Sequence, residues 1–391
     1  MKLSIQQSID KRKMNFYEIS QYIGNNPELG HEEYKACEVL TRELRENGFT
    51  VTVGTCGLET AFEAVYDSGK PGPKIAFMAE YDALPELGHA CGHHLIGTAA
   101  VAAGIGLAQA LSEAGGAVYI YGTPAEETRG GKVTMAENGV FDHLDVAMMV
   151  HPYSRYEESG LSLAMDAIQF DFHGKAAHAA ANPHEGINAL DAVIQTFNSI
   201  NALREHVTTD VRIHGIIAEG GQAANIVPDF ARAQFYVRAA TRAALDPVLE
   251  KVKNCAKGAA IATGAELETS FYELSYDDMN TNETLSKIYI DNMIKLGVAR
   301  EEIHPKQGGG SLDMGNVSQV VPSIHPYVKI TDGGLACHTH EFREAALSDQ
   351  GFEGLLVGAK TMALTAYDIL TNADYLRKIK EEFAEWKLYQ A

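Results

Sequence analysis

The stretch that decides the fold is KIAFMAEYDALPELGHACGHH, residues 74–94. Its first six residues, 74–79, are almost continuously apolar, which predicts a buried strand. A turn carrying the carboxylates of Glu80 and Asp82 follows, and the segment His89–His94 then places four potential metal ligands in six residues. Open α/β sheets build their sites at the carboxyl ends of strands. This stretch therefore predicts an α/β fold with a metal site at a strand end.

Three further segments supply residues of the same kind. The apolar run 117–121 is followed by Glu126 and Glu127, another apolar run ends in His151, and the polar segment His338–Glu341 lies near the C-terminus. One isolated pair of such residues is more typical of a core or a surface loop. Because four separate segments each deliver His, Cys or Glu, the pattern favours a metal site over packing.

The length, composition and net charge of the chain limit the class of protein and its partners. A chain of 391 residues with 46% hydrophobic content can bury a large core and is long enough for two domains. Its net charge of −20 argues against nucleic acid or an anionic membrane surface as a partner, since both require a basic patch. The first 22 residues contain no continuous apolar segment, so we expect neither a signal peptide nor a membrane span.

The number and spacing of the cysteines indicate the cellular compartment of the protein. The five cysteines are scattered and odd in number, which is not a disulfide framework, so we expect a cytoplasmic protein. Cys337 precedes His338, and two interpretations stay open for it: contact with the metals, or packing beside a ligand.

The order of patterns predicts two domains. Apolar residues recur at helical spacing from Ile5 to Phe49 with a break at 25–30, which indicates two helices, and strands then alternate with helices through His151 as in a parallel sheet. Residues 163–275 change to strand–helix–strand–strand–helix–strand, the order of a ferredoxin-like α+β sandwich. We therefore expect a discontinuous first domain, 1–162 and 276–391, with 163–275 inserted into it.

Further helices and strands are expected in residues 276–391, the second segment of the discontinuous first domain. They are a helix over Asn282–Leu296, a glycine-rich loop at 308–310, a short strand over Ser323–Lys329 and a helix from Leu347 onward.

Several motifs together resemble the zinc aminoacylase/carboxypeptidase family, metallopeptidase family twenty. The match covers nearly the whole chain and is carried by Asn26–Gly30, Ala79–Pro85, Gly88–His93, Pro124–Glu127 and Gly174–Ala180. Two later segments, Gly310–Ser318 and Pro322–His325, make the chain similar to the amidohydrolase subgroup that contains p-aminobenzoyl-glutamate hydrolases and related dipeptidases. The resemblance implies a zinc-exopeptidase-like α/β catalytic domain with a mixed, mostly parallel sheet, and an inserted ferredoxin-like lid and dimerisation domain.

The same resemblance implies two divalent metal ions per subunit and assigns their ligands. It makes Glu126 the general base and implies as metal ligands Cys91, His93, Glu127, His151 and His338. In much of the family an Asp bridges the metals at the position of Cys91, and other members carry a metal-binding His at the position of Glu80. A set of one thiolate, three imidazoles and one carboxylate suits borderline ions, so zinc is the first choice, with manganese, cobalt or nickel as substitutes.

Other residues have implied supporting roles. Asp82 orients a ligating imidazole, and Glu126 takes a proton from water and delivers it to the leaving nitrogen. His178 matches a lid histidine that reaches a partner subunit's site and stabilises the oxyanion, which implies a homodimer or a dimer of dimers joined through the lid. Asn225 and Arg238 match positions that hold the substrate's carboxylate. The role of His94, orienting or purely structural, stays open.

The leading hypothesis is a metal-dependent hydrolase that cuts an amide bond beside a free carboxylate, as in N-acyl amino acids, aminobenzoyl-glutamate or dipeptides. The alternatives are a peptidase, endopeptidases included, that acts on longer peptides, and a non-catalytic metal-binding protein on the same fold. A free carboxylate such as Glu126 beside the ligands speaks against the non-catalytic alternative, because a binding site has no need of it.

Overall fold

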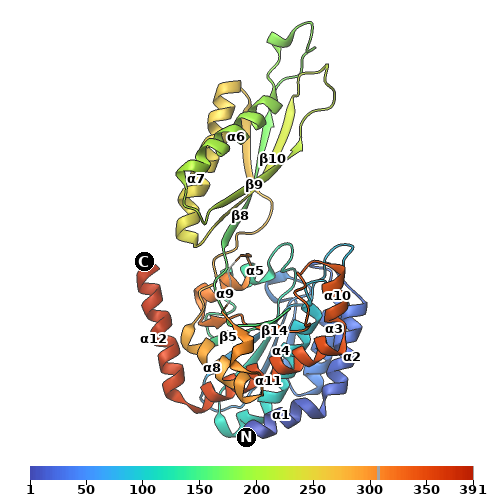
Figure 1. Ribbon diagram of the computed structural model, residues 1–391, viewed down its shortest axis with the longest axis vertical. Coiled ribbons are helices and arrows are strands. Elements are labelled where there is room, and N and C mark those ends of the chain that lie inside the picture. Colours follow the sequence, from blue (N-terminus) through green and yellow to red (C-terminus); the bar gives the residue numbers. More distant parts are fainter. Residues whose placement is uncertain (306–308, 391) are drawn as a thin grey trace. The chain divides into compact units, whose positions relative to one another are not determined.

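The computed structural model describes residues 1–305 and 309–390. This part of the chain forms two compact units (Figure 1). The first unit contains residues 1–161, 279–305 and 312–390, and the second contains Ser162–Asp278 and Gly309–Ser311. Gly308, the first residue of the expected glycine-rich loop, lies outside the described residues.

The main sheet of the first unit has the strand order β1-β2-β4-β3-β5-β13. Its strands are β1 (Thr50–Val53), β2 (Phe62–Asp67), β3 (Lys74–Ala79), β4 (Ala117–Gly122), β5 (Val146–Met148) and β13 (Ser323–Ile324). The four strands from β4 to β13 run parallel, whereas β1 and β2 add an antiparallel edge. The expected mixed, mostly parallel sheet is therefore confirmed.

A smaller sheet in the same unit has the order β12-β7-β14-β6. Its strands are β6 (His151–Tyr153), β7 (Tyr156–Glu157), β12 (Ile303–His304) and β14 (Tyr327–Lys329).

Helices cover both faces of the main sheet, so its central strands are apolar on both sides. On β3, Ile75 and Phe77 belong to one core cluster and Ala76 and Met78 to another. The first cluster includes residues of α1 (Lys2–Lys11), α2 (Lys13–Asn25), α3 (Tyr34–Glu46), α4 (His93–Ala114), α8 (Glu283–Lys295), α10 (His340–Ala346), α11 (Asp349–Thr371) and α12 (Ala373–Gln390). The second includes residues of α5 (Gly131–Glu137) and α9 (Met314–Val320).

The long helix α4 fills the centre of the first cluster. Among the described residues it is the one helix with the length and hydropathy of a membrane span, but 89% of that window is buried inside the protein. Its burial against α11 and the sheet is that of a core helix (Figure 1).

Three predicted elements are divided differently. The N-terminal segment forms three helices rather than two, because the backbone leaves the helical region at Arg12 (φ −102°, ψ 5°). The expected strand 323–329 is interrupted at His325-Pro326, so β13 pairs with β5 while β14 pairs with β6. Proline cannot donate to a ladder hydrogen bond, which favours such a break. The C-terminal helix breaks at Asn372 into α11 and α12.

The second unit is a four-stranded antiparallel sheet with the order β11-β8-β10-β9. Its elements are β8 (Ala164–His173), α6 (Ala189–Leu203), β9 (Arg212–Glu219), β10 (Phe230–Ala239), α7 (Arg242–Thr263) and β11 (Glu266–Phe271). This order is that of the expected ferredoxin-like sandwich, with α6 and α7 on one face (Figure 1). Short 3-10 helices occur at Thr55–Gly57, Pro183–Glu185, Arg204–His206 and Arg300–Glu302.

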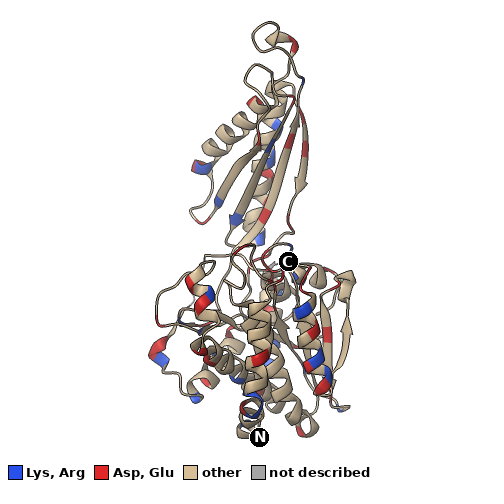
Figure 2. Ribbon diagram, turned by 90° about the vertical axis from the view of Figure 1, so that its right-hand side faces the viewer, with Lys and Arg blue, Asp and Glu red and all other residues tan. Residues whose placement is uncertain are grey.

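Alternation along β8 divides the two faces of this sheet. Phe170 and Phe172 are buried in the core under the helices, while Asp171 points to the opposite face and accepts hydrogen bonds from Arg232 at 2.6 and 2.9 Å. Figure 2 shows charged residues of both signs along the strands of this unit.

Candidate metal centre

The candidate centre is built around the start of α4. Gly92, between Cys91 and His93, has φ +81°, and a Cβ there would lie 2.5 Å from the Pro152 ring. Only glycine meets both conditions without strain. This turn brings Cys91, at the end of the loop, and His93, the first residue of α4, into one cluster of possible ligands.

Asp82 fixes the orientation of His93. The Nδ1 atom of His93 lies 2.8 Å from Asp82 Oδ1, and the second carboxylate oxygen of Asp82 accepts a hydrogen bond from the Glu127 backbone N–H at 3.0 Å. Burial opposes ionisation of Asp82, but the neighbouring His93 outweighs it and lowers the pKa of the carboxyl. The Nε2 atom of His93 is buried and has no hydrogen-bond partner among the described residues. This side chain is therefore oriented as a ligating imidazole would be.

The two glutamates follow β4 in a strained turn. Ala125 has φ +62°, a left-handed conformation that is uncommon for residues other than glycine. Its backbone N–H donates to Glu33 Oε1 at 2.8 Å, and Thr60 donates to the other oxygen of Glu33 at 2.7 Å. Glu33 was not predicted as a site residue, since it lies before α3 in a segment without a ligand motif. Its contact with Ala125 helps to place the adjacent Glu126 and Glu127.

All five predicted ligands fall into three overlapping groups in which the potential ligand atoms lie within 4.8 Å of one another. Cys91 Sγ is 3.4 Å from His151 Nε2, and His338 Nε2 is 3.1 Å from Glu127 Oε1. A backbone hydrogen bond of 3.0 Å from His338 to Ala90 brings the C-terminal segment to this place. The groups are Cys91–His93–His151, Cys91–Glu127–His338 and His93–Glu126–Glu127.

These residues fit divalent metal ions. The donors are one thiol, three imidazoles and a carboxylate, a mixture suited to zinc and other borderline ions. Burial alone would lower the pKa of His93, but the surrounding carboxylates raise it. This raised pKa indicates an excess of negative charge around the His93 imidazole. A cation would balance this charge and use the partnerless Nε2 atom.

Glu126 lies beside the same cluster. Its Oε2 atom is 3.9 Å from His93 Nε2, and its side chain is 14% exposed. Burial, followed by the charges of Glu127 and Glu80, raises the pKa of Glu126 well above its ordinary value. A carboxylate at this place, beside the ligand groups, can accept a proton from water bound there.

His94 and Cys337, whose roles the sequence does not decide, have different surroundings. His94 is fully buried with its Nε2 atom 3.2 Å from the carbonyl oxygen of Ala346, and burial lowers its pKa to about 4. It belongs to none of the ligand groups found among the described residues. The side chain of Cys91 lowers the pKa of the Cys337 thiol, so Cys337 lies beside a predicted ligand.

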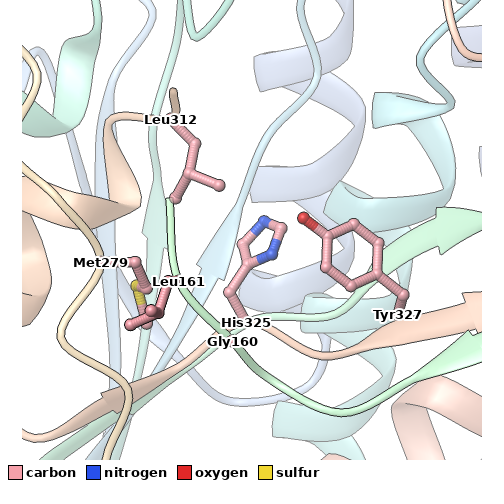
Figure 3. Close-up of a pocket in the computed structure, with 6 residues that line it drawn as sticks. All are labelled: Gly160, Leu161, Met279, Leu312, His325 and Tyr327. Carbon is pink, nitrogen blue, oxygen red and sulfur yellow. The ribbon is translucent and has the colours of Figure 1, made fainter. Parts of the chain in front are cut away.

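A small pocket of about 10 Å³, room for about one water molecule, is lined in part by His325 and Tyr327 (Figure 3). The ring of His151 is 5.5 Å from that of His325 and 5.3 Å from that of Tyr327. Neither His325 nor Tyr327 was predicted as a site residue, although His325 belongs to a motif that supported the subgroup resemblance. The pocket is lined by Gly160, Leu161, Met279, Leu312, His325 and Tyr327.

The second unit carries the other predicted residues at two separate places. His178 and Asn225 lie on adjoining exposed segments, linked by the hydrogen bond from Ala179 N–H to the Asn225 carbonyl at 3.0 Å. Arg238 lies near the opposite end of β10, donates to Ser311 at 2.9 Å and stacks over Tyr236. Within one subunit's second unit, Asn225 and Arg238 therefore do not form a single carboxylate site.

A mostly parallel α/β unit with this donor cluster, joined to a ferredoxin-like unit, defines a metal-dependent hydrolase. Residues 165–263 match the model of the M20 peptidase dimerisation domain. The chain is 38% identical over 389 residues to Xaa-Arg dipeptidase from Mus musculus, covering 96% of this chain and 90% of the relative. A p-aminobenzoyl-glutamate hydrolase polypeptide of Escherichia coli is 28% identical over 97% of this chain and 94% of its own.

A solved structure has the same fold. A Bacillus subtilis dinuclear metal-binding peptidase of the M20 family aligns with a TM-score of 0.67 at 21% identity, covering 91% of this chain and 98% of that one. The chain belongs to the M20 peptidase family of metal-dependent amidohydrolases and peptidases.

Proposed function

We propose that this enzyme hydrolyses the amide bond of small substrates that carry a free carboxylate beside that bond. N-acyl amino acids, aminobenzoyl-glutamate-like compounds and dipeptides all have this chemistry. The observation that carries the proposal is the place of Glu126, 3.9 Å from His93 and next to Glu127 in one ligand group. A base beside the ligands is what hydrolysis requires and what metal storage does not.

The chain's own residues divide the work. Two divalent ions would be held by Cys91, His93, Glu127, His151 and His338. When bound, they would polarise the amide carbonyl and lower the pKa of water. Glu126 takes the proton from the attacking water and transfers it to the leaving nitrogen. Asp82 keeps the Nε2 atom of His93 directed at the cluster through the 2.8 Å contact with Nδ1.

The names of the relatives narrow the substrate class. The mouse relative is named Xaa-Arg dipeptidase and the bacterial one p-aminobenzoyl-glutamate hydrolase, and both names describe an amide bond to an amino acid with a free carboxylate. Arg238 supplies a guanidinium for such a carboxylate.

The second unit supports assembly into a homodimer or a dimer of dimers. It contains the match to the peptidase dimerisation domain, and β9 is an edge strand of its sheet. Ile216 and Ile217 on β9 are 61% and 46% exposed, and edge strands with exposed apolar residues tend to pair with another chain. We take β9 as the strand that contacts the partner, with His178 serving the partner's site.

The expected metal is zinc, with manganese, cobalt and nickel as functional substitutes, because of the mixed thiol and imidazole donors. A reducing cytoplasm suits a chain whose five cysteines are all free.

The test is a hydrolysis panel on protein loaded with each metal in turn. The panel contains dipeptides with C-terminal arginine, lysine, alanine or glutamate, N-acetyl amino acids and aminobenzoyl-glutamate, and matched substrates with an amidated C-terminus serve as controls. We expect turnover only for substrates with a free carboxylate. Equal turnover of the amidated controls, or none on the whole panel with metal bound, would refute the proposal.

A further inference from the structure

A buried ion cluster lies next to the metal centre and belongs to none of the ligand groups found among the described residues. Lys132, in the first turn of α5, is completely buried, and so is Asp313, while Glu80 is 2% exposed. Lys132 Nζ donates to Glu80 Oε1 at 2.5 Å and to Asp313 Oδ1 at 2.7 Å. Three charged side chains from separate elements are thus desolvated together.

The cluster is geometrically specific. Asp313 precedes α9 at its N-cap position, yet its carboxylate makes no cap hydrogen bond and instead accepts from both Nζ and the backbone N–H of Lys132. Burial alone would lower the pKa of Lys132, but the charges of Asp313 and Glu80 overcome it and raise that pKa. Lysine is therefore held as a cation inside the protein.

Stability alone is a weak reason for such a cluster. Burying three charges costs desolvation energy, and apolar residues of similar volume often stabilise a fold equally well or better. Two carboxylates and one ammonium also leave one negative charge in excess. That excess calls for an explanation outside the cluster.

The explanation lies in the second oxygen of Glu80. Glu80 Oε2 is 3.6 Å from His93 Nε2, the buried imidazole atom that has no hydrogen-bond partner among the described residues. On the opposite ring nitrogen, Asp82 already occupies Nδ1. The ligating side of His93 therefore faces Glu80 as well as Glu127, whose Oε1 is 3.8 Å away.

We propose that Glu80 is a positioning carboxylate of the metal centre, fixed by Lys132 so that its second oxygen faces the ions held by His93 and Glu127. Lys132 occupies one oxygen, which leaves the other at a set position, and Asp313 holds Lys132 in place. Because Glu80 adds negative charge where the ions bind, it increases their retention. This inference rests on the metal centre of the proposed function.

The test compares Zn²⁺ affinity, measured by competition with a chelating dye, in the wild type and in Glu80→Gln. Glutamine keeps the acceptor for Lys132 and removes only the charge. We expect Zn²⁺ affinity to fall about 10–100-fold, the usual effect of losing a group that supports the ligands. Lys132→Met should weaken Zn²⁺ binding in the same direction because it releases Glu80.

Asp166→Asn is the matched control. Asp166 is a buried partner of Arg242 in the second unit, at 2.8 Å, so its loss also disrupts a buried ion pair. We expect lower thermal stability in this variant with unchanged Zn²⁺ affinity. Wild-type affinity in Glu80→Gln, or an equal loss in Asp166→Asn, would overturn the inference. A wild type that binds Zn²⁺ but hydrolyses nothing would overturn the proposed function alone, because the affinity comparison needs no turnover.

Discussion

Combining Glu126→Gln subunits with His178→Ala subunits should restore activity that neither variant has alone. The reason lies in the second unit, where His178 and Asn225 lie beyond the Phe230 end of β10 and Arg238 lies near the other end. Phe230 and Arg238 are eight residues apart, which is about 26 Å at 3.3 Å per strand residue. A dipeptide-sized substrate held by Arg238 of one subunit cannot also contact the His178 of that subunit.

The expected activity follows from counting intact sites. In a mixed dimer, one site combines an intact Glu126 with an intact His178 from the other subunit, and the second site lacks both. A purified mixed dimer should therefore show about one half of the wild-type activity, and a randomly exchanged mixture about one quarter.

The assay uses two affinity tags and co-expression to isolate mixed dimers, whose dipeptide hydrolysis is then measured. The matched control pairs a wild-type subunit with one that carries both substitutions. If His178 acts in the partner's site, this control dimer is inactive, because each of its sites lacks one group. A half-active control together with an inactive mixed dimer would refute the reasoning, since it would place His178 in its own subunit's site.

Three further outcomes are expected. Glu126→Gln should retain its metals and lose about 10²–10⁴-fold or more in turnover because the proton acceptor is gone, so near-normal turnover would contradict its role as base. Cys91→Ser should lose metal on dialysis because a neutral hydroxyl replaces a thiolate, and an unchanged metal content by elemental analysis would exclude Cys91 as a ligand. Burial raises the pKa of Glu33 to about 7 from 4.5, so the folded state binds the extra proton and this group's stabilisation declines as the pH rises towards and through 7. In urea unfolding, the difference in the free energy of unfolding between wild type and Glu33→Gln should change by up to about 3 kcal/mol between pH 4.5 and 8. If this difference does not change with pH, the pKa of Glu33 is not raised.

The sequence by itself determined the class of fold and predicted the candidate donor residues. Alternating apolar patterns predicted the ferredoxin-like second unit, because periodicity depends on which face of each strand is buried. Cys91 and His93 are two residues apart within the motif of residues 89–94, so the sequence alone predicts that they lie close together. His338 came from a distant segment, and its inclusion depended on the resemblance to a known family.

The tertiary structure decided which polar residues support that centre. Lys132 appears in the sequence as an ordinary helix lysine, and such residues are almost never fully buried. Only the fold brings Glu80 and Asp313 to its ammonium group, at 2.5 and 2.7 Å. The hydrogen bond from the Ala125 backbone N–H to Glu33 likewise joins segments far apart in the chain. Local patterns record which side chains are apolar, whereas the partner of a buried charge is set by long-range packing, which a single sequence does not encode locally.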